Sequence, residues 1–427
     1  MGSKVLIIGN GGREHALAWK LVQSSNIDKL YVAPGNGGTQ NVAENVSIEA
    51  TDTESLVRFA EKNKIDLTVV GPDDPLALGV VDAFKSRDLR IFGPTRKAAK
   101  IEWSKAFAKK LMRDQNISTA SFRIFREYDK ALDYICKHGT PIVVKASGLA
   151  LGKGAYPCKT FAEAKKALAD IMLKRVYKEA GNEVIIEEFL DGQEISIHAL
   201  CDGKTSILLP TAQDHKPIGD YDKGKNTGGM GTIAPVPWVT AEMLQNIERQ
   251  IVKPTLNGLT KEGRLFTGCL YPGLKMTPEG LKVLEFNARF GDPETQSYMR
   301  LLKTDLFDIL EACVEGKLAE LTIEWHSGFA VCVVLASGGY PEKYRKGIPI
   351  FGVEQAEKIS GVVVFHAGTK AYCDQLRTSG GRVLGITAIG KTLKEALNRA
   401  YEAISYIKFN GMQYRKDIGA KAISMGF

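Results

Sequence analysis

The sequence lacks several features that would place it in a special class of protein. No apolar run approaches the roughly 20 residues that a membrane-spanning helix needs, so we expect no membrane partner. The chain runs from Lys4 directly into an apolar strand at Val5–Gly9, which leaves no room for a signal peptide. Internal repeats, low-complexity segments and long disordered linkers are also missing. These absences predict a globular, cytoplasmic protein.

Cysteine and histidine are scarce and scattered. The seven cysteines form no CxxC pair, and they do not cluster with any of the six histidines. A disulfide framework and a structural zinc site are therefore not expected. We expect reduced thiols, which fits a cytoplasmic location.

The excess of positive charge is too dispersed to indicate a nucleic-acid partner. The formal net charge is +8, and lysine and arginine are spread along all 427 residues. Nucleic-acid-binding proteins usually gather this charge in one stripe with interleaved aromatic residues. We expect no nucleic acid, and we assign the excess to anionic small substrates.

The length and the pattern of strands and helices predict about three domains. Residues 1–104 alternate strands and helices, including a helix at Leu76–Ser86, as in a parallel α/β domain. Residues 105–327 should form a second domain with a lobe at about 120–190, and residues 328–427 a small α+β domain. The predicted fold class is thus multidomain α/β and α+β.

The most informative stretch is Leu284–Glu294, at the end of a predicted hairpin. The strand Leu281–Arg289 alternates apolar and polar residues, so Glu285, Asn287 and Arg289 should share one face. Leu284 and Phe286 should then point into a core. Carboxylate and amide oxygens suit Mg²⁺, and a guanidinium binds phosphate or carboxylate. The alternative is a solvated sheet face.

Two glycine-rich turns follow neighbouring strands of the first domain. Gly9-Asn10-Gly11-Gly12-Arg13 links a strand to a helix, where exposed N–H groups favour phosphate. The dinucleotide fingerprint GxGxxG fails because Glu14 occupies its third glycine position. The second turn begins at Pro34-Gly35-Asn36. Two such turns favour a phosphorylated sugar over a dinucleotide, and simple chain reversal is the plain alternative.

A third glycine-rich segment, Lys145–Gly154, does not fit a Walker A motif. Three residues separate Gly148 from Gly152, Gly154 follows Lys153, and strand-like residues come next. A glycine-rich lid over nucleotide phosphates fits better, with Lys145 on a strand. A mobile surface loop is the alternative.

Two further segments have the composition of a nucleotide site. Val184–Leu190 reads as a buried strand leading to a linker whose backbone can contact an adenine edge, and Glu194 can accept from ribose hydroxyls. The polar stretches Gln213–Lys216 and Asn226–Gly231 look like mobile active-site loops. An acidic surface loop without function is the alternative for Glu194.

Taken in order, these features resemble the ATP-grasp ligases. The motifs GNGGREHAL, APGN, KASGLALGKG, AQDHK, NTGGMG, LEFNARFGDPE and YRKDIG are similar to those of the phosphoribosylamine–glycine ligase family over essentially the whole chain. The resemblance implies ATP-dependent joining of glycine to 5-phosphoribosylamine through glycyl phosphate, with Mg²⁺ or Mn²⁺, in purine biosynthesis. We expect a monomer with a parallel N-terminal domain, a two-lobed ATP-grasp domain and a C-terminal α+β domain.

The resemblance also implies roles for individual residues. Glu285 and Asn287 match the metal ligands, and Arg289, Lys145 and Asp214 are the expected catalytic residues. The expected ATP-binding residues are Lys105, Lys145, Gly148, Gly152, Lys153, Gly154, Glu187, Glu188, Phe189, Leu190 and Glu194. The expected substrate-binding residues are Gly9, Asn10, Gly11, Gly12, Arg13, Pro34, Gly35, Asn36, Asp214, Arg289 and Asp292.

One departure and two rival functions remain. Many ATP-grasp enzymes carry a further metal carboxylate on the strand before Glu-x-Asn, but Tyr271–Thr277 has none. The number of metal ions is therefore open. The nearer rival is another ATP-grasp carboxylate–amine ligase or carboxylase of nucleotide metabolism. The farther rival is a nucleotide sensor without catalysis.

Overall fold

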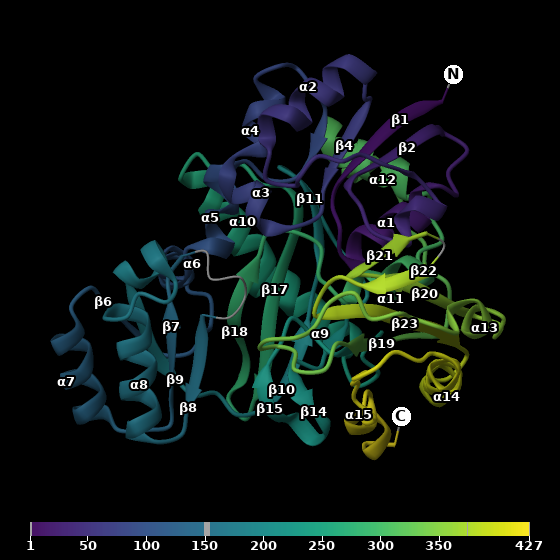
Figure 1. Cartoon of the computed structure of the whole chain (residues 1–427). Helices are drawn as coiled ribbons and strands as arrows, with labels where there is room; N and C mark the ends of the chain where they lie inside the picture. Colours follow the sequence, from purple (N-terminus) through teal and green to yellow (C-terminus); the bar gives the residue numbers. More distant parts are fainter. Residues whose placement is uncertain (1, 149–153, 374, 427) are drawn as a thin grey trace.

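The computed structural model describes residues 2–148, 154–373 and 375–426. Gly152 and Lys153 lie outside these residues. Three parts are visible in Figure 1: an N-terminal domain at the top, a separate lobe at the lower left, and a C-terminal part at the lower right. The long strands β17 (Thr267–Thr277) and β18 (Gly280–Asn287) run between them.

The N-terminal domain is a parallel sheet with helices on both faces, as predicted. The strand order is β3-β2-β1-β4-β5, and every pairing is parallel. Alternate residues of β1 enter different cores: Leu6 packs with α2, α4 and α5, whereas Val5 packs with α1 and with α12 from later in the chain. The elements are β1 Ser3–Gly9, α1 Gly12–Leu21, β2 Ile27–Pro34, β3 Glu44–Asn45, α2 Thr53–Asn63, β4 Leu67–Val70, α3 Asp73–Leu78, α4 Val80–Lys85, β5 Ile91–Phe92, α5 Arg96–Trp103 and α12 Leu306–Glu315.

The helix predicted at Leu76–Ser86 is wrong as a single element. The chain forms α3 and α4 instead, and Gly79 joins them in the left-handed region with φ of 91°. Only glycine adopts that conformation without strain, so the helix ends there and restarts in a new direction. Apolar periodicity alone carried no sign of this break.

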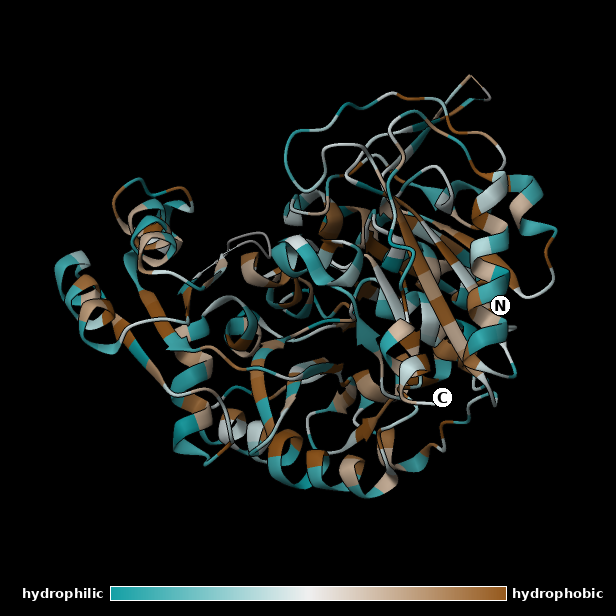
Figure 2. Ribbon diagram, turned by 90° about the horizontal axis from the view of Figure 1, so that it is seen from below, coloured by the Kyte–Doolittle hydropathy of each residue, from teal (hydrophilic) through white to brown (hydrophobic). Residues whose placement is uncertain are grey.

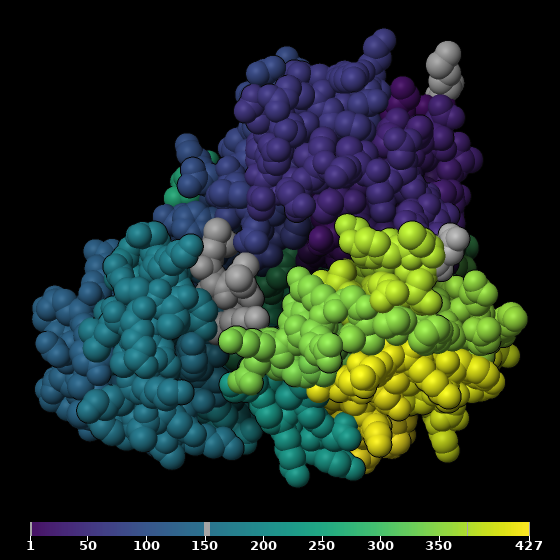
Figure 3. All heavy atoms as spheres, viewed as in Figure 1, coloured from purple at the N-terminus to yellow at the C-terminus, as the bar shows by residue number. Residues whose placement is uncertain are grey.

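The lid lobe has a sheet and a core of its own. Its strands follow the order β6-β9-β7-β8, with antiparallel pairs throughout, and α7 and α8 contribute to the same buried cluster as β7 and β9. Figure 3 shows this lobe projecting to one side of the molecule. The elements are β6 Phe122–Phe125, α7 Tyr128–His138, β7 Ile142–Ala146, β8 Ala155–Cys158, α8 Phe161–Met172 and β9 Val184–Glu188.

The central sheet confirms the predicted hairpin but corrects its details. A bulge interrupts the β17–β18 pairing, because Gly273 faces Glu285 while Leu274 faces Val283. Leu284 is therefore only half-buried, and Val283 occupies the core position expected for it. The strand also ends at Asn287, before Arg289. The other elements of this region are α6 Lys105–Asp114, β10 Gln193–Ser196, β11 Ala199–Asp202, β12 Ser206–Leu208, α9 Ala241–Ile247 and α10 Lys253–Lys261.

The C-terminal sheet takes two of its strands from the preceding region. Its order is β13-β16-β19-β23-β20, so the segments predicted as mobile loops around Gln213 and Gly231 are partly strands. Light green and purple atoms touch in Figure 3, where this part lies against the N-terminal domain. The elements are β13 Gln213–Asp214, β14 Pro217–Gly219, β15 Lys223–Asn226, β16 Gly231–Ala234, α11 Glu294–Leu301, β19 Phe329–Ala336, α13 Val353–Glu357, β20 Val362–His366, β21 Thr369–Tyr372, β22 Gln375–Thr378, β23 Arg382–Gly390, α14 Leu393–Tyr406 and α15 Ala420–Ser424.

Hydrophobic residues line the strands, and hydrophilic residues cover the outer faces of the helices, as Figure 2 shows. This distribution is the one expected for elements that bury one face each. In the described part of the chain, no helix is long and apolar enough to cross a membrane.

Candidate active site

Four lysines and three carboxylates alternate along the contact between the lid lobe and β18. We call this set the lysine row: Lys105, Lys109, Lys145 and Lys216 with Glu187, Glu194 and Glu285. Lys105 begins α6, and its Nζ lies 2.7 Å from Glu285 Oε2. Lys216 Nζ lies 3.5 Å from the other oxygen of Glu285. The row holds together residues from the central region and from the lid lobe.

The inner end of the lysine row is almost fully buried. Lys145 on β7 forms an ion pair with Glu187 on the neighbouring strand β9, and its Nζ also donates to the carbonyl of Leu284 at 3.2 Å. Lys109 Nζ reaches the second oxygen of Glu187 at 2.6 Å. Glu187 is thus an ionised carboxylate between two ammonium groups. Burial opposes its charge, but Lys145 and Lys109 hold its pKa below the usual value.

Most members of the row face one pocket. The pocket is narrow in this structure, with about 10 Å³ of space open to the centre of a water molecule. Its wall combines charged ends with apolar side chains, as expected for a site that takes a partly apolar, partly anionic ligand. It is lined by Ile101, Glu102, Lys105, Ala108, Lys109, Met112, Lys145, Leu284, Glu285 and Phe286.

Glu285 and Asn287 fit a divalent cation that also contacts phosphate. Lys105, and then Lys216, hold the pKa of Glu285 well below its usual range, so the carboxylate is ionised. The amide oxygen of Asn287 accepts from Arg289 Nη2 at 3.3 Å. Among the described residues, no group of three or more His, Cys, Asp and Glu side chains could hold a metal ion. A cation here would take its remaining oxygens from ligand and water.

The predicted nucleotide hinge lies beside this pocket. Glu188 belongs to the sheet, because its N–H donates to the carbonyl of Ser121 at 3.0 Å, and its side chain is exposed. The carbonyl of the buried Leu190 accepts from Lys275 Nζ at 3.3 Å. Glu194 lies 3.5 Å from Lys275 and 3.8 Å from Lys216. The predicted ribose acceptor is therefore held between two cations.

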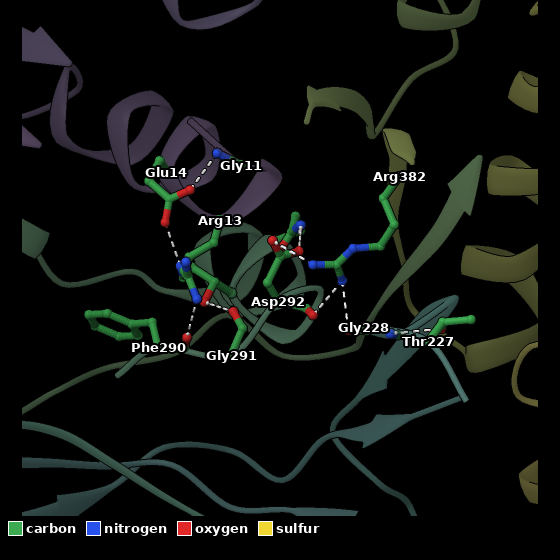
Figure 4. A network of polar contacts seen from close by, with 12 residues as sticks. Gly11, Arg13, Glu14, Thr227, Gly228, Phe290, Gly291, Asp292 and Arg382 are labelled. Atoms are coloured by element: carbon green, nitrogen blue, oxygen red, sulfur yellow. Dashed lines mark hydrogen bonds and ion pairs between the residues drawn. The ribbon is translucent and has the colours of Figure 1, made fainter. Parts of the chain in front are cut away.

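A second charged region lies where the N-terminal domain, the segment after β18 and the C-terminal sheet meet. We call it the arginine junction: Arg13, Arg289 and Arg382 around the turn Phe290–Asp292. The carbonyl of Phe290 accepts from Arg13 Nη1 at 3.0 Å and from Arg289 Nη1 at 3.3 Å. Arg382, from β23, donates to the carbonyls of Asp292 at 2.6 Å and Gly228 at 2.7 Å (Figure 4). Arg13 comes from α1, Arg289 from the segment after β18, and Arg382 from β23.

Arg382 is one of the site residues that the sequence did not indicate. It also forms an ion pair with Asp292, 3.1 Å from Nη2 to Oδ2. Its local signal is weak: a glycine pair, Gly380-Gly381, precedes it at the start of a strand. Glycine there permits close approach of other chain segments, but the sequence does not say which ones.

The glycine turn after β1 contains an internal carboxylate. Glu14 Oε2 accepts from the N–H of Gly11 at 2.5 Å, and Glu14 Oε1 accepts from Arg13 Nε at 2.5 Å (Figure 4). A Cβ at Gly11 would lie 2.7 Å from Glu14 Oε2. Glu14 therefore occupies the centre of the turn, and phosphate binding by these glycines stays a prediction.

Asn36 joins the two glycine turns to the C-terminal sheet. Its Nδ2 donates to the carbonyl of Asn10 at 3.0 Å, of Gly11 at 3.2 Å and of His366 at 2.9 Å. The cluster predicted at the ends of β1 and β2 is thus assembled. The cluster is completed by His366 of β20, which those motifs could not predict.

Asp214, which is half-buried, and Glu294, which is buried, place two carboxyl groups near the junction. Burial, and then Glu294, raise the pKa of Asp214 well above its usual value. Glu294 accepts from Ser196 Oγ at 2.9 Å and from the hydroxyl of Tyr271 at 2.6 Å. A Cβ at Gly229 would lie 2.6 Å from Asp214 Oδ1. The glycines of NTGGMG therefore allow close backbone approach to Asp214.

His215 serves packing rather than chemistry. Its Nδ1 lies 3.1 Å from the carbonyl of Gly231, and its Nε2 accepts from the N–H of Gly419 at 3.2 Å. Burial, and then Arg415, lower its pKa to about 4, so the ring stays neutral. The ring fixes the segment between β13 and β14, which places Asp214 and Lys216.

Three family models match successive parts of the chain. The phosphoribosylglycinamide synthetase N domain matches residues 3–102, the ATP-grasp (A) domain of the same family matches 103–295, and the C domain matches 330–421. Together they cover most of the described structure. The predicted fold class is confirmed by this match and by the sheets above.

Characterised relatives and solved structures give the same result. A phosphoribosylamine–glycine ligase of Caldanaerobacter subterraneus is 50% identical over 98% of this chain and 99% of its own. One from Vibrio cholerae is 48% identical over 99% of both chains. The crystal structure of the Thermotoga maritima phosphoribosylamine–glycine ligase aligns with a TM-score of 0.85 at 33% identity, covering 97% of this chain and 100% of that one. A biotin carboxylase domain from Hydrogenobacter thermophilus, at 15% identity and a TM-score of 0.73, shares the fold alone.

Proposed function

Because the chain belongs to the phosphoribosylglycinamide synthetase family, we propose that it is an ATP-dependent carbon–nitrogen ligase that joins glycine to 5-phosphoribosylamine. The products are glycinamide ribonucleotide, ADP and phosphate, in purine biosynthesis. We also propose that it works as a monomer in the cytoplasm. Sedimentation of the purified chain tests whether it is a monomer.

One observation carries the proposal. The segment from Glu285 to Asp292 begins in the lysine row and ends in the arginine junction. A nucleotide at the pocket of the row would direct its γ-phosphate along this segment. The glycine carboxylate and the sugar amine, held at the junction, would then lie on the opposite side of the γ-phosphate. Positioning and charge neutralisation are what phosphoryl transfer mainly needs from a protein.

In the first step, an oxygen of the glycine carboxylate attacks the γ-phosphorus, and the bond from that phosphorus to ADP breaks. Lys105 and Lys145 neutralise the nucleotide phosphates, the backbone of Glu187–Leu190 contacts adenine, and Glu194 contacts ribose. The lid glycines that the structure describes are Gly148, which follows β7, and Gly154, which precedes β8. Arg289 stabilises the transferred phosphoryl group, which becomes glycyl phosphate.

Glu285 and Asn287 would hold Mg²⁺ or Mn²⁺. When bound, such a cation neutralises charge on the phosphate oxygens. The present ion pairs of Glu285 with Lys105 and Lys216 keep that carboxylate ionised before any cation binds. With Glu285 as a metal ligand, Lys105 and Lys216 would be free to contact the phosphates.

In the second step, the sugar amine attacks the carbonyl carbon of glycyl phosphate, and the bond to phosphate breaks. Asp214 would hold the glycine ammonium, since a cation next to it favours its ionised form. Arg13, Asn36 and Asp292 line the junction where the phosphoribosylamine would lie. Because Glu14 fills the centre of the glycine turn, the sugar would contact the outer edge formed by Asn10–Gly12 and Pro34–Gly35.

A coupled assay for ADP tests this function. Purified protein with Mg²⁺ should release ADP only when ATP, glycine and phosphoribosylamine are all present, and each substrate is omitted in turn as a control. Bicarbonate with biotin should give no ADP, which separates this function from that of a carboxylase with the same fold. ADP formation without glycine would contradict the proposal. Binding of ATP with no turnover would favour a sensor.

A further inference from the structure

Lys109 is a buried lysine of the ATP pocket to which neither the motifs nor the reaction assign a role. It is 2% exposed, and the two groups next to it are nearly as buried, Glu187 at 3% and Lys145 at 6%. Glu187 lies between the two ammonium groups and forms an ion pair with each of them. Two cations therefore share one carboxylate at the place where a nucleotide is expected.

The two lysines differ in their other contacts. Lys109 Nζ also donates to Thr119 Oγ1 at 2.7 Å, and this hydroxyl donates to the carbonyl of Val283 at 2.6 Å. Lys109 further lies 5.5 Å from the centre of the Phe122 ring. Besides Glu187, Lys145 is held by the carbonyl of Leu284 at 3.2 Å. Lys109 is thus fixed by several groups away from any ligand, and Lys145 by fewer.

We propose that Lys109 is a positioning residue for the ATP site: it remains with Glu187 as a resident counter-ion and so allows Lys145 to move to the nucleotide phosphates. The inference rests on the proposed ATP-binding function. If Glu187 had Lys145 as its sole partner, moving Lys145 to a phosphate would leave a buried carboxylate unpaired, which is strongly unfavourable. With Lys109 in place, Glu187 keeps a counter-ion throughout.

The geometry supports a resident role. The Glu187 oxygen that contacts Lys109 is different from the one that contacts Lys145, so one partner can leave without disturbing the other. Burial lowers the pKa of Lys109 to about 8, and Glu187 counters this shift. Lys109 is therefore still an ammonium at neutral pH, and binding is best measured at pH 7.

The test is a set of four variants whose affinity for a non-hydrolysable ATP analogue with Mg²⁺ is measured by calorimetry at pH 7. They are Lys109→Met, Glu187→Gln, the double variant with both changes, and Lys110→Met. Lys110 is the exposed neighbour of Lys109 on the same helix, so it provides a matched control. Thermal unfolding of each variant verifies the fold.

Lys109→Met should bind the analogue roughly 10- to 100-fold more weakly than wild type, because Glu187 then retains Lys145. Lys110→Met should bind normally. Adding Glu187→Gln to Lys109→Met should restore most of the affinity, since Lys145 no longer faces a competing carboxylate. A merely structural role for Lys109 would not predict rescue by a second loss of charge.

Two results would overturn the inference while leaving the ATP site in place. One is wild-type affinity in Lys109→Met. The other is a double variant that binds more weakly than Glu187→Gln alone, which would mean that Lys109 contacts the nucleotide itself. This second comparison remains decisive if Lys109→Met fails to fold. If wild-type protein does not bind the analogue, the proposed function fails as well.

Discussion

The lysine row and the arginine junction hold positive charge in different ways. In the lysine row, each ammonium is paired with a carboxylate: Lys105 with Glu285, and Lys145 and Lys109 with Glu187. In the arginine junction, the guanidinium groups also donate to backbone carbonyls, those of Phe290, Asp292 and Gly228. A carboxylate neutralises the positive charge that it contacts, whereas a carbonyl orients the charged group without neutralising it.

The difference indicates different tasks. Lysine is a compact charge on a flexible stem, so it can exchange a carboxylate for a phosphate when the ligand enters. Arginine has a rigid planar fork that can hold two acceptors at once and keep its direction. The junction has carboxylates too, but burial raises the pKa of Glu102, the partner of Arg289, to about 7. Arg289 thus faces a carboxyl group that is only partly ionised at pH 7, whereas Arg382 has Asp292 as its partner at 3.1 Å.

The largest effect should follow from breaking the lysine row at Glu285. Glu285→Gln removes the charge that the metal and both lysines share, and turnover should fall about 100-fold or more. The unfolding midpoint should change little, because this side chain is 27% exposed. The steady-state rate is measured at limiting and saturating Mg²⁺. Glu279→Gln, at the exposed turn of the same hairpin, is the control; near-normal activity of Glu285→Gln at limiting Mg²⁺ would refute its role.

Breaking the arginine junction should spare the nucleotide. Arg382→Met removes a guanidinium that orients Gly228 and Asp292, so the KM for phosphoribosylamine should rise about 10-fold, as for a lost charge-assisted contact. Affinity for the ATP analogue should stay at the wild-type value. The exposed Arg345 gives a matched control as Arg345→Met. Equal losses of nucleotide and sugar binding would show that the two regions are not separate.

Gly11→Val should also weaken sugar binding without changing nucleotide binding, but by a smaller factor than Arg382→Met. Its Cβ would meet Glu14 Oε2 at 2.7 Å and Asp292 Oδ2 at 3.2 Å, and so would displace the internal carboxylate. We expect the sugar KM to rise several-fold, on the order of 1 kcal/mol, with nucleotide affinity unchanged. Circular dichroism must first show a normal fold. A fall in nucleotide affinity alone would assign the turn to the ATP site.

The smallest expected effect concerns the short segment between β13 and β14 that joins the two regions. His215 lies between Asp214 of the junction side and Lys216 of the row, and its folded pKa is about 4. The unfolded residue takes up a proton near pH 6.5 while the folded one stays neutral, so stability falls as pH decreases toward 4. From pH 7 to pH 6 the loss is about 0.7 kcal/mol.

Denaturant unfolding of wild type and of His215→Gln at both pH values measures this loss. Glutamine can still accept from Gly419 but does not titrate, so its stability should fall less over the same interval. An identical decrease in the two proteins would mean that His215 is not the group responsible.

The sequence predicted the row better than the junction, and the reason is distance along the chain. The alternation of apolar and polar residues along one strand predicted that Glu285 and Asn287 share a face, and Lys145 belongs to a recognisable motif. Lys109 carries no such mark: it is one of two adjacent lysines on a helix, and only packing against Glu187 distinguishes it from Lys110. Periodicity also could not show the bulge at Leu284, which shifts the core position to Val283.

The junction depends on contacts between segments far apart in the sequence. Arg382 and Asp292 are 90 positions apart, and no local pattern links them. Glu14 was predicted only as the residue that spoils a dinucleotide fingerprint. In the structure it has a positive role, since its carboxylate occupies the space that the neighbouring glycines leave. A pattern of glycines indicates that another group packs closely against the backbone there, but it does not identify that group.

The central claim is that a carboxylate held at the arginine junction accepts the phosphoryl group of a nucleotide held at the lysine row. Glycine labelled with ¹⁸O in both carboxylate oxygens tests this directly, with mass spectrometry of the released phosphate. If glycyl phosphate forms, each phosphate should carry one ¹⁸O, because the oxygen that attacks the γ-phosphorus leaves with it. Unlabelled phosphate, formed at the same rate as the amide product, would contradict the account.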